Sequence, residues 1–276
     1  MKRKNLITAS AIISMALASC GSAQSGEPFG GNAIKGNGSI VTRNFDVKSF
    51  DDLAVFLPFT TNYDVNVTIA DNYSCTVRMD ENLFEYLEIK VKDGELQLGK
   101  PQKQMKENLS PTACVIEVTA PSLDEVNMAG RGNINMLSPL NANKMEFFVA
   151  GSGNIVFTKP ANIVHLELGI AGSGDIRIPD LVSDHLEIDI TGSGNAKIER
   201  GTVTKAEVDI AGSGDCDLAC QVEKLEADIA GSGDITARVN GQLEYSIIGS
   251  GSINYYGNPA IKGDKLGRGK VNPLGD

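Results

Sequence analysis

The stretch IAGSGDI occupies residues 170–176, and the same seven letters return at residues 229–235. Near copies lie between and around these two stretches, and each copy carries two glycines separated by one residue. The seven pairs are Gly130 and Gly132, Gly151 and Gly153, Gly172 and Gly174, Gly192 and Gly194, Gly212 and Gly214, Gly231 and Gly233, and Gly249 and Gly251. From pair to pair the spacing falls slowly from 21 to 18 residues. A steady period near 20 is too short for two helices with their turns, and it is typical of a solenoid.

The residues on both sides of each glycine pair alternate between apolar and polar. Two positions before the first glycine stand Met128, Val149, Ile170, Ile190, Ile210, Ile229 and Ile247. Four positions after it stand Ile134, Ile155, Ile176, Ala196, Cys216, Ile235 and Ile253. This alternation is typical of strands with one buried face, and the stretch before the next repeat, such as residues 179–185, supplies a third side. The sequence therefore predicts an all-β fold, a parallel β-helix with three-sided coils of about 20 residues.

The glycine pairs are interpreted as corners of these coils. Glycine adopts positive φ at little cost, and its missing side chain lets neighbouring coils stack closely. A loop that holds a dinucleotide needs a third glycine, and a P-loop needs a lysine; neither follows at the required spacing. Asn or Asp follows most of the pairs, as is common in turns. The pairs therefore predict structural corners instead of a ligand-binding loop.

The first 38 residues predict a targeting sequence followed by a linker. Residues 1–19 read as a signal peptide, with three basic residues at positions 2–4 and an apolar stretch over 6–18 that is too short for a membrane span. Residues 17–20, Leu-Ala-Ser-Cys, resemble a bacterial lipobox, which implies cleavage before Cys20 and acylation of its sulfur. By the same resemblance, Gly21 in place of aspartate favours the outer membrane, with the periplasmic or the surface face left open. Residues 20–38 are rich in Gly and Ser, as a flexible tether is.

Residues 39–276 predict a single β-helix domain, because no Pro/Gly/Ser-rich linker divides them. We expect irregular amino-terminal coils over 39–120, regular coils over 121–256 and a carboxy-terminal cap over 257–276. Cys75 and Cys114 lie in separate predicted strands, and the sequence leaves open whether an oxidising compartment joins them in a disulfide. Cys216 falls at an inward position, where it packs as a small apolar residue.

Three parts of the sequence resemble a known family. They are TAPSLDEVNMAG at 119–130, the Gly-Ser-Gly-Asn/Asp corners, and YYGNPAIKGDKLGRGKV at 255–271. Together they resemble the domain of unknown function called the putative auto-transporter adhesin, head GIN domain, over about residues 40–272. The resemblance implies a right-handed parallel β-helix, exported by Gram-negative bacteria and often carried as a lipoprotein. It brings no catalytic residue, because the family has none agreed.

Stacked coils turn each repeat position into a column, with neighbours about 4.8 Å apart. Five positions before the first glycine the column is Glu125, Glu146, Glu167, Glu187, Glu207, Glu226 and Glu244. Two positions earlier stand Lys144, His165, His185, Lys205 and Lys224, and two positions later stand Asp189, Asp209 and Asp228. Adjacent like charges at this spacing repel by about 1 kcal/mol even in water.

Two accounts of these columns are open. In the simpler account the Lys and His column pairs sideways with the glutamates, so both histidines are surface pairing residues. In the sharper account a double acidic column forms a binding face for a cation such as Ca²⁺ or for a glycan. Its members are Glu187, Asp189, Glu207, Asp209, Glu226 and Asp228.

The composition limits the function. A net charge of −10 and a pI near 4.8 argue against nucleic acid as a partner. The sequence shows no nucleophile with a nearby base, no metal-binding motif and no cofactor motif. We therefore expect a non-enzymatic envelope lipoprotein, an adhesin whose flat charged face meets a glycan or a protein and whose lipid enters the membrane. A carbohydrate-active β-helix enzyme and a purely structural spacer are the alternatives.

Overall fold

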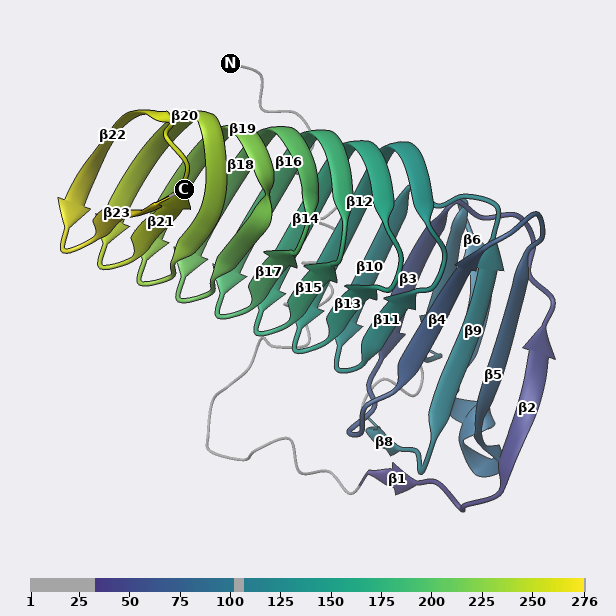
Figure 1. The fold of residues 1–276 in the computed structure, drawn as a ribbon. Coiled ribbons are helices and arrows are strands. Elements are labelled where there is room, and N and C mark those ends of the chain that lie inside the picture. The colour runs from purple at the N-terminus through teal and green to yellow at the C-terminus, as the bar shows by residue number, and fades with distance from the viewer. Residues whose placement is uncertain (1–32, 102–106, 276) are drawn as a thin grey trace.

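The computed structural model describes residues 33–101 and 107–275. It shows an all-β solenoid, in which the chain winds in coils of about 20 residues and every coil pairs in parallel with the next (Figure 1). This confirms the predicted fold class. The long strands of the regular coils are β12 (Leu140–Gly151), β14 (Ala161–Gly172), β16 (Leu181–Gly192) and β18 (Gly201–Gly212). The short strands are β13 (Asn154–Phe157), β15 (Asp175–Ile178) and β17 (Asn195–Ile198), and later coils merge both kinds in β19 (Cys216–Gly231) and β20 (Ile235–Gly249), followed by β21 (Ser252–Tyr256).

Each long strand makes two of the three sides of its coil. In β14 the buried side chains are Ala161 and Ile163, and then Leu166, Leu168 and Ile170. The alternation changes phase between Ile163 and Leu166, so the chain bends there. The short strand that follows forms the remaining side.

The core is a continuous stack of aliphatic side chains inside the coils. Leu168, Ile188 and Val208 occupy one inward column and are at most 3% exposed. Burying one such side chain contributes roughly 1.5–3 kcal/mol, and each coil stacks its inward residues on those of its neighbours. The stability of the solenoid is therefore distributed over many similar contacts between adjacent coils.

The corners are held by glycines that leave no room for a side chain. The first glycine of every pair has positive φ, from +117° at Gly151 to +145° at Gly231. A Cβ atom on Gly172 would lie less than 3.0 Å from the carbonyl oxygen of Gly151. That oxygen accepts a 2.7 Å hydrogen bond from the Ser173 N–H, so the close approach is part of the pairing between coils.

The Asn and Asp residues that follow the corners form a ladder along the solenoid. The Asp175 carboxylate accepts hydrogen bonds from the backbone N–H and the side-chain amide of Asn195, at 2.9 and 2.8 Å. The side-chain oxygens of Asn195, Asp215 and Asp234 each accept from a backbone N–H one coil further on. The turn preference seen in the sequence therefore has a second cause, since each side chain satisfies a donor of the next coil.

The amino-terminal part departs from the expected irregular coils. β3 (Asp52–Leu57) and β4 (Asp64–Ile69) do extend the solenoid, because they pair in parallel with β10 (Glu125–Gly130) and β11 (Asn133–Met136). β7 (Glu95–Gly99) and β9 (Cys114–Ala120) continue this pairing on β3 and β4. β2 (Ile40–Phe45), β5 (Ser74–Asp80) and β6 (Glu88–Lys92) instead run antiparallel to their neighbours. The described remainder is β1 (Ile34–Lys35), β8 (Leu109–Ser110) and the 3-10 helix η1 (Glu81–Tyr86).

The expectation of coils over 39–120 was therefore wrong for these antiparallel strands. Apolar alternation predicts a strand but not its direction. The tight turn between β6 and β7 consists of Asp93 and Gly94, both with positive φ (53° and 88°). An Asp-Gly pair in this conformation is a hairpin signal, and it could have identified the antiparallel pair of β6 and β7.

A buried carboxylate ties this region together. Asp80 ends β5, is 0% exposed, and accepts hydrogen bonds from the Gly38 N–H (2.7 Å), the Thr112 N–H (2.8 Å) and the Thr112 hydroxyl (2.7 Å). Burial alone would raise the pKa of Asp80, but these hydrogen bonds outweigh it and hold the pKa below its ordinary value. The side chain joins two segments that are distant in the sequence.

The register of β5 and β9 argues against the disulfide that the sequence left open. Cys75 lies opposite Val118, and Cys114 lies opposite Met79. The cysteines are thus four positions out of register, or about 13 Å along the strands, whereas a disulfide needs Cα atoms within about 7 Å. Both are buried free thiols, as are Cys216 and Cys220.

The segment expected as a cap, 257–276, adds one more coil as far as it is described. β22 (Ala260–Gly267) and β23 (Lys270–Gly275) pair in parallel with β20 and β21. The inward positions of β22 change character, because Gly263 lies against the Tyr245 ring and Lys265 stands in register with Ile247. The apolar stack therefore ends here. Among the described residues, no helix has the length and apolar character that a membrane span needs.

Candidate functional site

A row of carboxylates runs along one side of the solenoid. The predicted glutamate column is in register from coil to coil: Glu125, Glu146, Glu167, Glu187, Glu207, Glu226 and Glu244. Two further members, Asp52 and Glu95, join it through β3 and β7. The repeat pattern did not identify these two residues, because the amino-terminal strands lack the glycine corner that aligns the other coils.

A second acidic column stands beside the first over three coils. Asp189, Asp209 and Asp228 pair in register on β16, β18 and β19. The structure therefore brings together all six candidate residues, Glu187, Asp189, Glu207, Asp209, Glu226 and Asp228, and we call this set the acidic strip. Burial, and then the charges of Asp189 and Asp228, raise the pKa of Asp209 to about 6. The pKa of Glu187 and that of Asp189 are raised as well, first by burial and then by neighbouring carboxylates.

Lysine side chains neutralise part of the negative charge of the glutamate column. Lys144 pairs with Glu146 and, at 3.2 Å, with Glu167. Lys205 pairs with Glu207 and reaches to 3.9 Å from Glu226. The hydrogen bond to Glu207 raises the pKa of Lys205. Within the described residues, none of the three aspartates of the acidic strip has an ion-pair partner.

The two histidines do not pair with glutamate as expected. The rings of His165 and His185 stack on each other, with centroids 4.8 Å apart and planes 8° apart. Across 33–101 and 107–275 neither ring forms an ion pair with a carboxylate. They line a shallow depression of about 220 Å³ together with Glu167, Glu187 and Lys205.

A larger hollow of about 430 Å³ lies where the amino-terminal strands meet the first coils. Asp52, Asp124, Glu125, Lys144 and Glu146 provide its charged lining. Burial, and then the charge of Glu125, raise the pKa of Asp52 to about 6. No sequence motif identifies this hollow, because the residues that line it come from β3, β12 and the segment before β10. It lies at the amino-terminal end of the same row of carboxylates.

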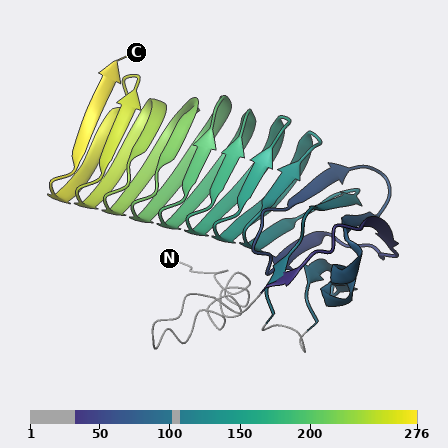
Figure 2. The same ribbon diagram turned by 90° about the horizontal axis from the view of Figure 1, so that it is seen from below.

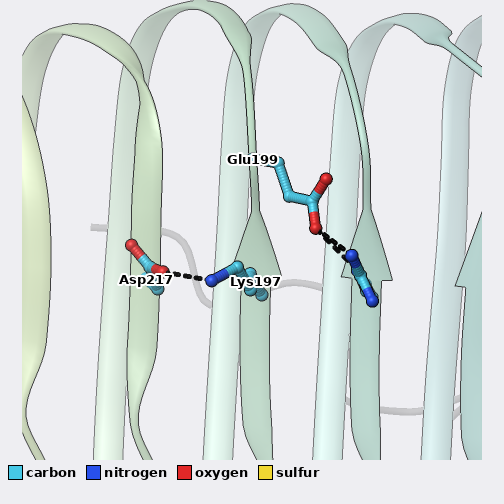
Figure 3. A network of polar contacts seen from close by, with 4 residues as sticks. Lys197, Glu199 and Asp217 are labelled. Atoms are coloured by element: carbon cyan, nitrogen blue, oxygen red, sulfur yellow. Dashed lines mark hydrogen bonds and ion pairs between the residues drawn. The ribbon is translucent and has the colours of Figure 1, made fainter.

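Charges on another side of the solenoid are paired. Figure 3 shows Lys197, Glu199 and Asp217, where the Lys197 ammonium lies 2.8 Å from Asp217. Glu199 accepts a 2.7 Å hydrogen bond from Arg177 Nε, and Arg200 lies 3.7 Å from Asp180. The unpaired aspartates of the acidic strip are therefore not a general property of the surface. In the part of the chain that the structure covers, no group of three or more His, Cys, Asp or Glu side chains is arranged to hold a metal ion.

Comparisons with known proteins agree with this architecture. The family model described as "Putative auto-transporter adhesin, head GIN domain" matches residues 49–164 and again 149–259. A solved structure described as a putative lipid binding protein, from Parabacteroides distasonis, is 33% identical, with a TM-score of 0.82 over 88% of this chain and 100% of that one. Solved structures of putative adhesins from Parabacteroides distasonis and Parabacteroides merdae also match 88% of this chain and 100% of their own. They are 23% and 22% identical, with TM-scores of 0.81 and 0.79, and they share the fold. No curated protein matches the chain.

Proposed function

Since the chain belongs to the family described as "Putative auto-transporter adhesin, head GIN domain", we propose that it is a non-enzymatic binding protein of the cell envelope, and that the acidic strip contacts its partner. One observation carries the proposal: Asp189, Asp209 and Asp228 are stacked in register without a basic partner among the described residues. The raised pKa of Asp209 means that its charge costs stability at neutral pH. Groups kept at such a cost are candidates for a functional site.

The chemistry of the acidic strip suggests what it binds. Ionised carboxylates accept hydrogen bonds and donate none, so they suit the hydroxyl groups of a glycan or the amines of a protein segment. The strip repeats once per coil along a straight line, about 4.8 Å per step. We therefore propose an extended partner, a glycan chain or a protein segment, that presents several donors in a row.

The alternative of a carbohydrate-active enzyme is less well supported. A lyase on this face would need a basic side chain that is free to remove a proton. Lys205 lies next to the strip, but it is hydrogen-bonded to Glu207 and its pKa is raised, so it holds its proton. The imidazoles of His165 and His185 border the same depression, and their rings are stacked on each other. A binding role needs no such group.

We expect that neutralising the three aspartates of the acidic strip weakens partner binding. Asp189→Asn, Asp209→Asn and Asp228→Asn combined should lower the affinity at least about tenfold, because each charged hydrogen bond contributes about 1.5–3 kcal/mol. The measurement is a screen of a glycan array and of whole cells with the chain from residue 21 onward, followed by titration of each hit. The matched control is Lys197→Gln with Asp217→Asn on the paired side, which should bind as the parent does. Hits that bind the triple variant unchanged would refute a role for the strip.

We also propose that the protein is held in the outer membrane by lipid on Cys20, which lies outside the described residues. The support is the lipobox-like sequence at 17–20 and the signal-peptide pattern before it. The expected result is that cells fed an alkyne-tagged fatty acid label the parent protein and fail to label Cys20→Ala. Ser22→Ala is the matched control and should keep the label. A labelled Cys20→Ala would disprove this attachment site.

A lipid is a second candidate ligand, because the 33% identical relative is described as a putative lipid binding protein. The inward columns are filled by side chains such as Leu168, Ile188 and Leu218, all at most 3% exposed. In the coils that the structure describes, these inward columns leave no room for an acyl chain, and we expect a lipid to contact the outer surface.

A further inference from the structure

The outward position just before each corner changes at the carboxy-terminal end of the solenoid. In most coils this position holds a small side chain: Ala129, Ala150, Ala171, Thr191, Ala211 and Ala230. In the last two coils it holds Ile248 and Leu266, which pair in register and are 57% and 72% exposed. A single exposed leucine needs no explanation. Two adjacent aliphatic side chains do need one, because the coils from β10 to β19 carry alanine or threonine at this position and only β3, at the other end, carries a larger residue, the half-buried Phe56.

The same end of the molecule is basic, although the chain as a whole is acidic. Over residues 260–275, as far as the structure describes it, the last coil carries Lys262, Lys265, Arg268 and Lys270, against one acidic residue, Asp264. Lys262 continues the glutamate column, and Lys270 continues the column of Asn, Asp and Ser side chains that follows the corners. Arg268 and Lys270 follow the corner glycine Gly267 by one and three positions, whereas Leu266 precedes it, and both basic residues are exposed. We call Ile248, Leu266, Arg268 and Lys270 the terminal patch.

Protection of the last strand against aggregation explains only part of this pattern. Lysines on an edge strand, an inward charge and proline all hinder pairing with another strand. Lys262, Lys265 at an inward position, and Pro273 fit that role. Ile248 and Leu266 do the opposite, because exposed aliphatic side chains favour association.

We propose that the terminal patch docks on an anionic lipid surface. Aliphatic side chains can enter the boundary between headgroups and acyl chains, and each basic residue near an anionic membrane contributes about a factor of five in affinity. Two copies meeting end to end would instead bring their basic coils together. The inference rests on the second candidate ligand of the proposed function and is independent of the acidic strip. The last coil, yellow in Figure 2, lies at the far end of the solenoid from the purple and blue amino-terminal strands.

Vesicle flotation tests this with the chain from residue 21 onward, which lacks the expected signal peptide and the acylated cysteine. The crystallised relatives match over their whole length to 88% of this chain, so we expect this part to fold on its own. The chain should float together with phosphatidylcholine vesicles that contain phosphatidylglycerol. With vesicles of pure phosphatidylcholine it should remain at the bottom of the gradient. High salt should weaken the binding. Arg268→Gln with Lys270→Gln should lower the affinity about thirtyfold, and Leu266→Gln about tenfold.

Matched changes elsewhere serve as controls. Val182→Gln replaces an aliphatic side chain that is 50% exposed on β16, and Lys159→Gln removes an exposed charge in a turn. Both should leave flotation unchanged. The proposal fails if the parent binds neither vesicle, binds both equally, or loses no affinity in the patch variants. It also fails if the parent is a dimer that Leu266→Gln converts to monomers without any vesicle binding, because the patch would then be a contact between copies. Loss of glycan or cell binding in the acidic-strip variant bears only on that strip.

Discussion

Replacing Gly172 by valine is expected to lower the free energy of unfolding by at least about 3 kcal/mol. Gly172 has φ +133°, a conformation that a β-branched residue adopts only at high cost. Its Cβ would also meet the Gly151 carbonyl oxygen at less than 3.0 Å, and that oxygen is held by the Ser173 N–H. Relief would require the two coils to separate and to lose this hydrogen bond. Urea unfolding followed by circular dichroism measures the change.

The adjacent residue gives a matched control. Ser173 is exposed, and its contribution to the corner is its backbone N–H, which alanine keeps. Ser173→Ala should therefore leave the midpoint of unfolding almost unchanged, and Gly172→Ala should fall between the two. If Gly172→Val and Ser173→Ala unfold at the same urea concentration, the corner does not constrain the chain in the way described.

Asp80→Ala is expected to destabilise the amino-terminal region by at least about 3 kcal/mol, because two backbone N–H groups and one hydroxyl lose their acceptor. The effect should depend on pH. The pKa of Asp80 is lower in the folded than in the unfolded chain, so its contribution is fully present above the unfolded value near 4 and is lost as the pH falls through the folded value. The difference in stability between parent and variant should therefore shrink in acid.

Urea unfolding of both chains, repeated from neutral pH down to about 2, measures this difference. Asp71→Ala is the control, since Asp71 is exposed in the turn between β4 and β5. A parent–variant difference that stays constant with pH would mean that the Asp80 carboxylate is not the stabilising group. Asp80→Asn should restore little of the stability that Asp80→Ala loses, because an amide offers one acceptor oxygen where the carboxylate offers two.

The regular coils could be predicted because one physical pattern recurs. Each coil needs a residue with positive φ at the same corner and apolar side chains at fixed distances from it, so Gly172 and Ile170 identify their counterparts in other coils. The same alignment placed Glu187, Glu207 and Glu226 in one column, and their register on β16, β18 and β19 agrees with it.

The features that could not be predicted depend on contacts between segments that do not share the repeat. Asp52 joins the glutamate column only because β3 stacks on β10, and the hollow beside it needs three separate segments. The alternation of apolar and polar residues in β2 and β5 does not determine that these two strands pair antiparallel. The stacking of His165 and His185 follows from their register, but whether a histidine prefers its neighbour or a glutamate depends on side-chain geometry.

The direction of the backbone hydrogen bonds determines how the protein bears force. These bonds run along the axis of the solenoid, from each coil to the next. A pull along this axis would load all coil boundaries in series and would separate the coils at the weakest one, whereas a pull along a strand would shear the bonds of a boundary together. A tension applied between the amino terminus and a partner on the acidic strip crosses only the boundaries up to β19 (Figure 1). The coils of β20 to β23 lie outside that path and would bear none of the load.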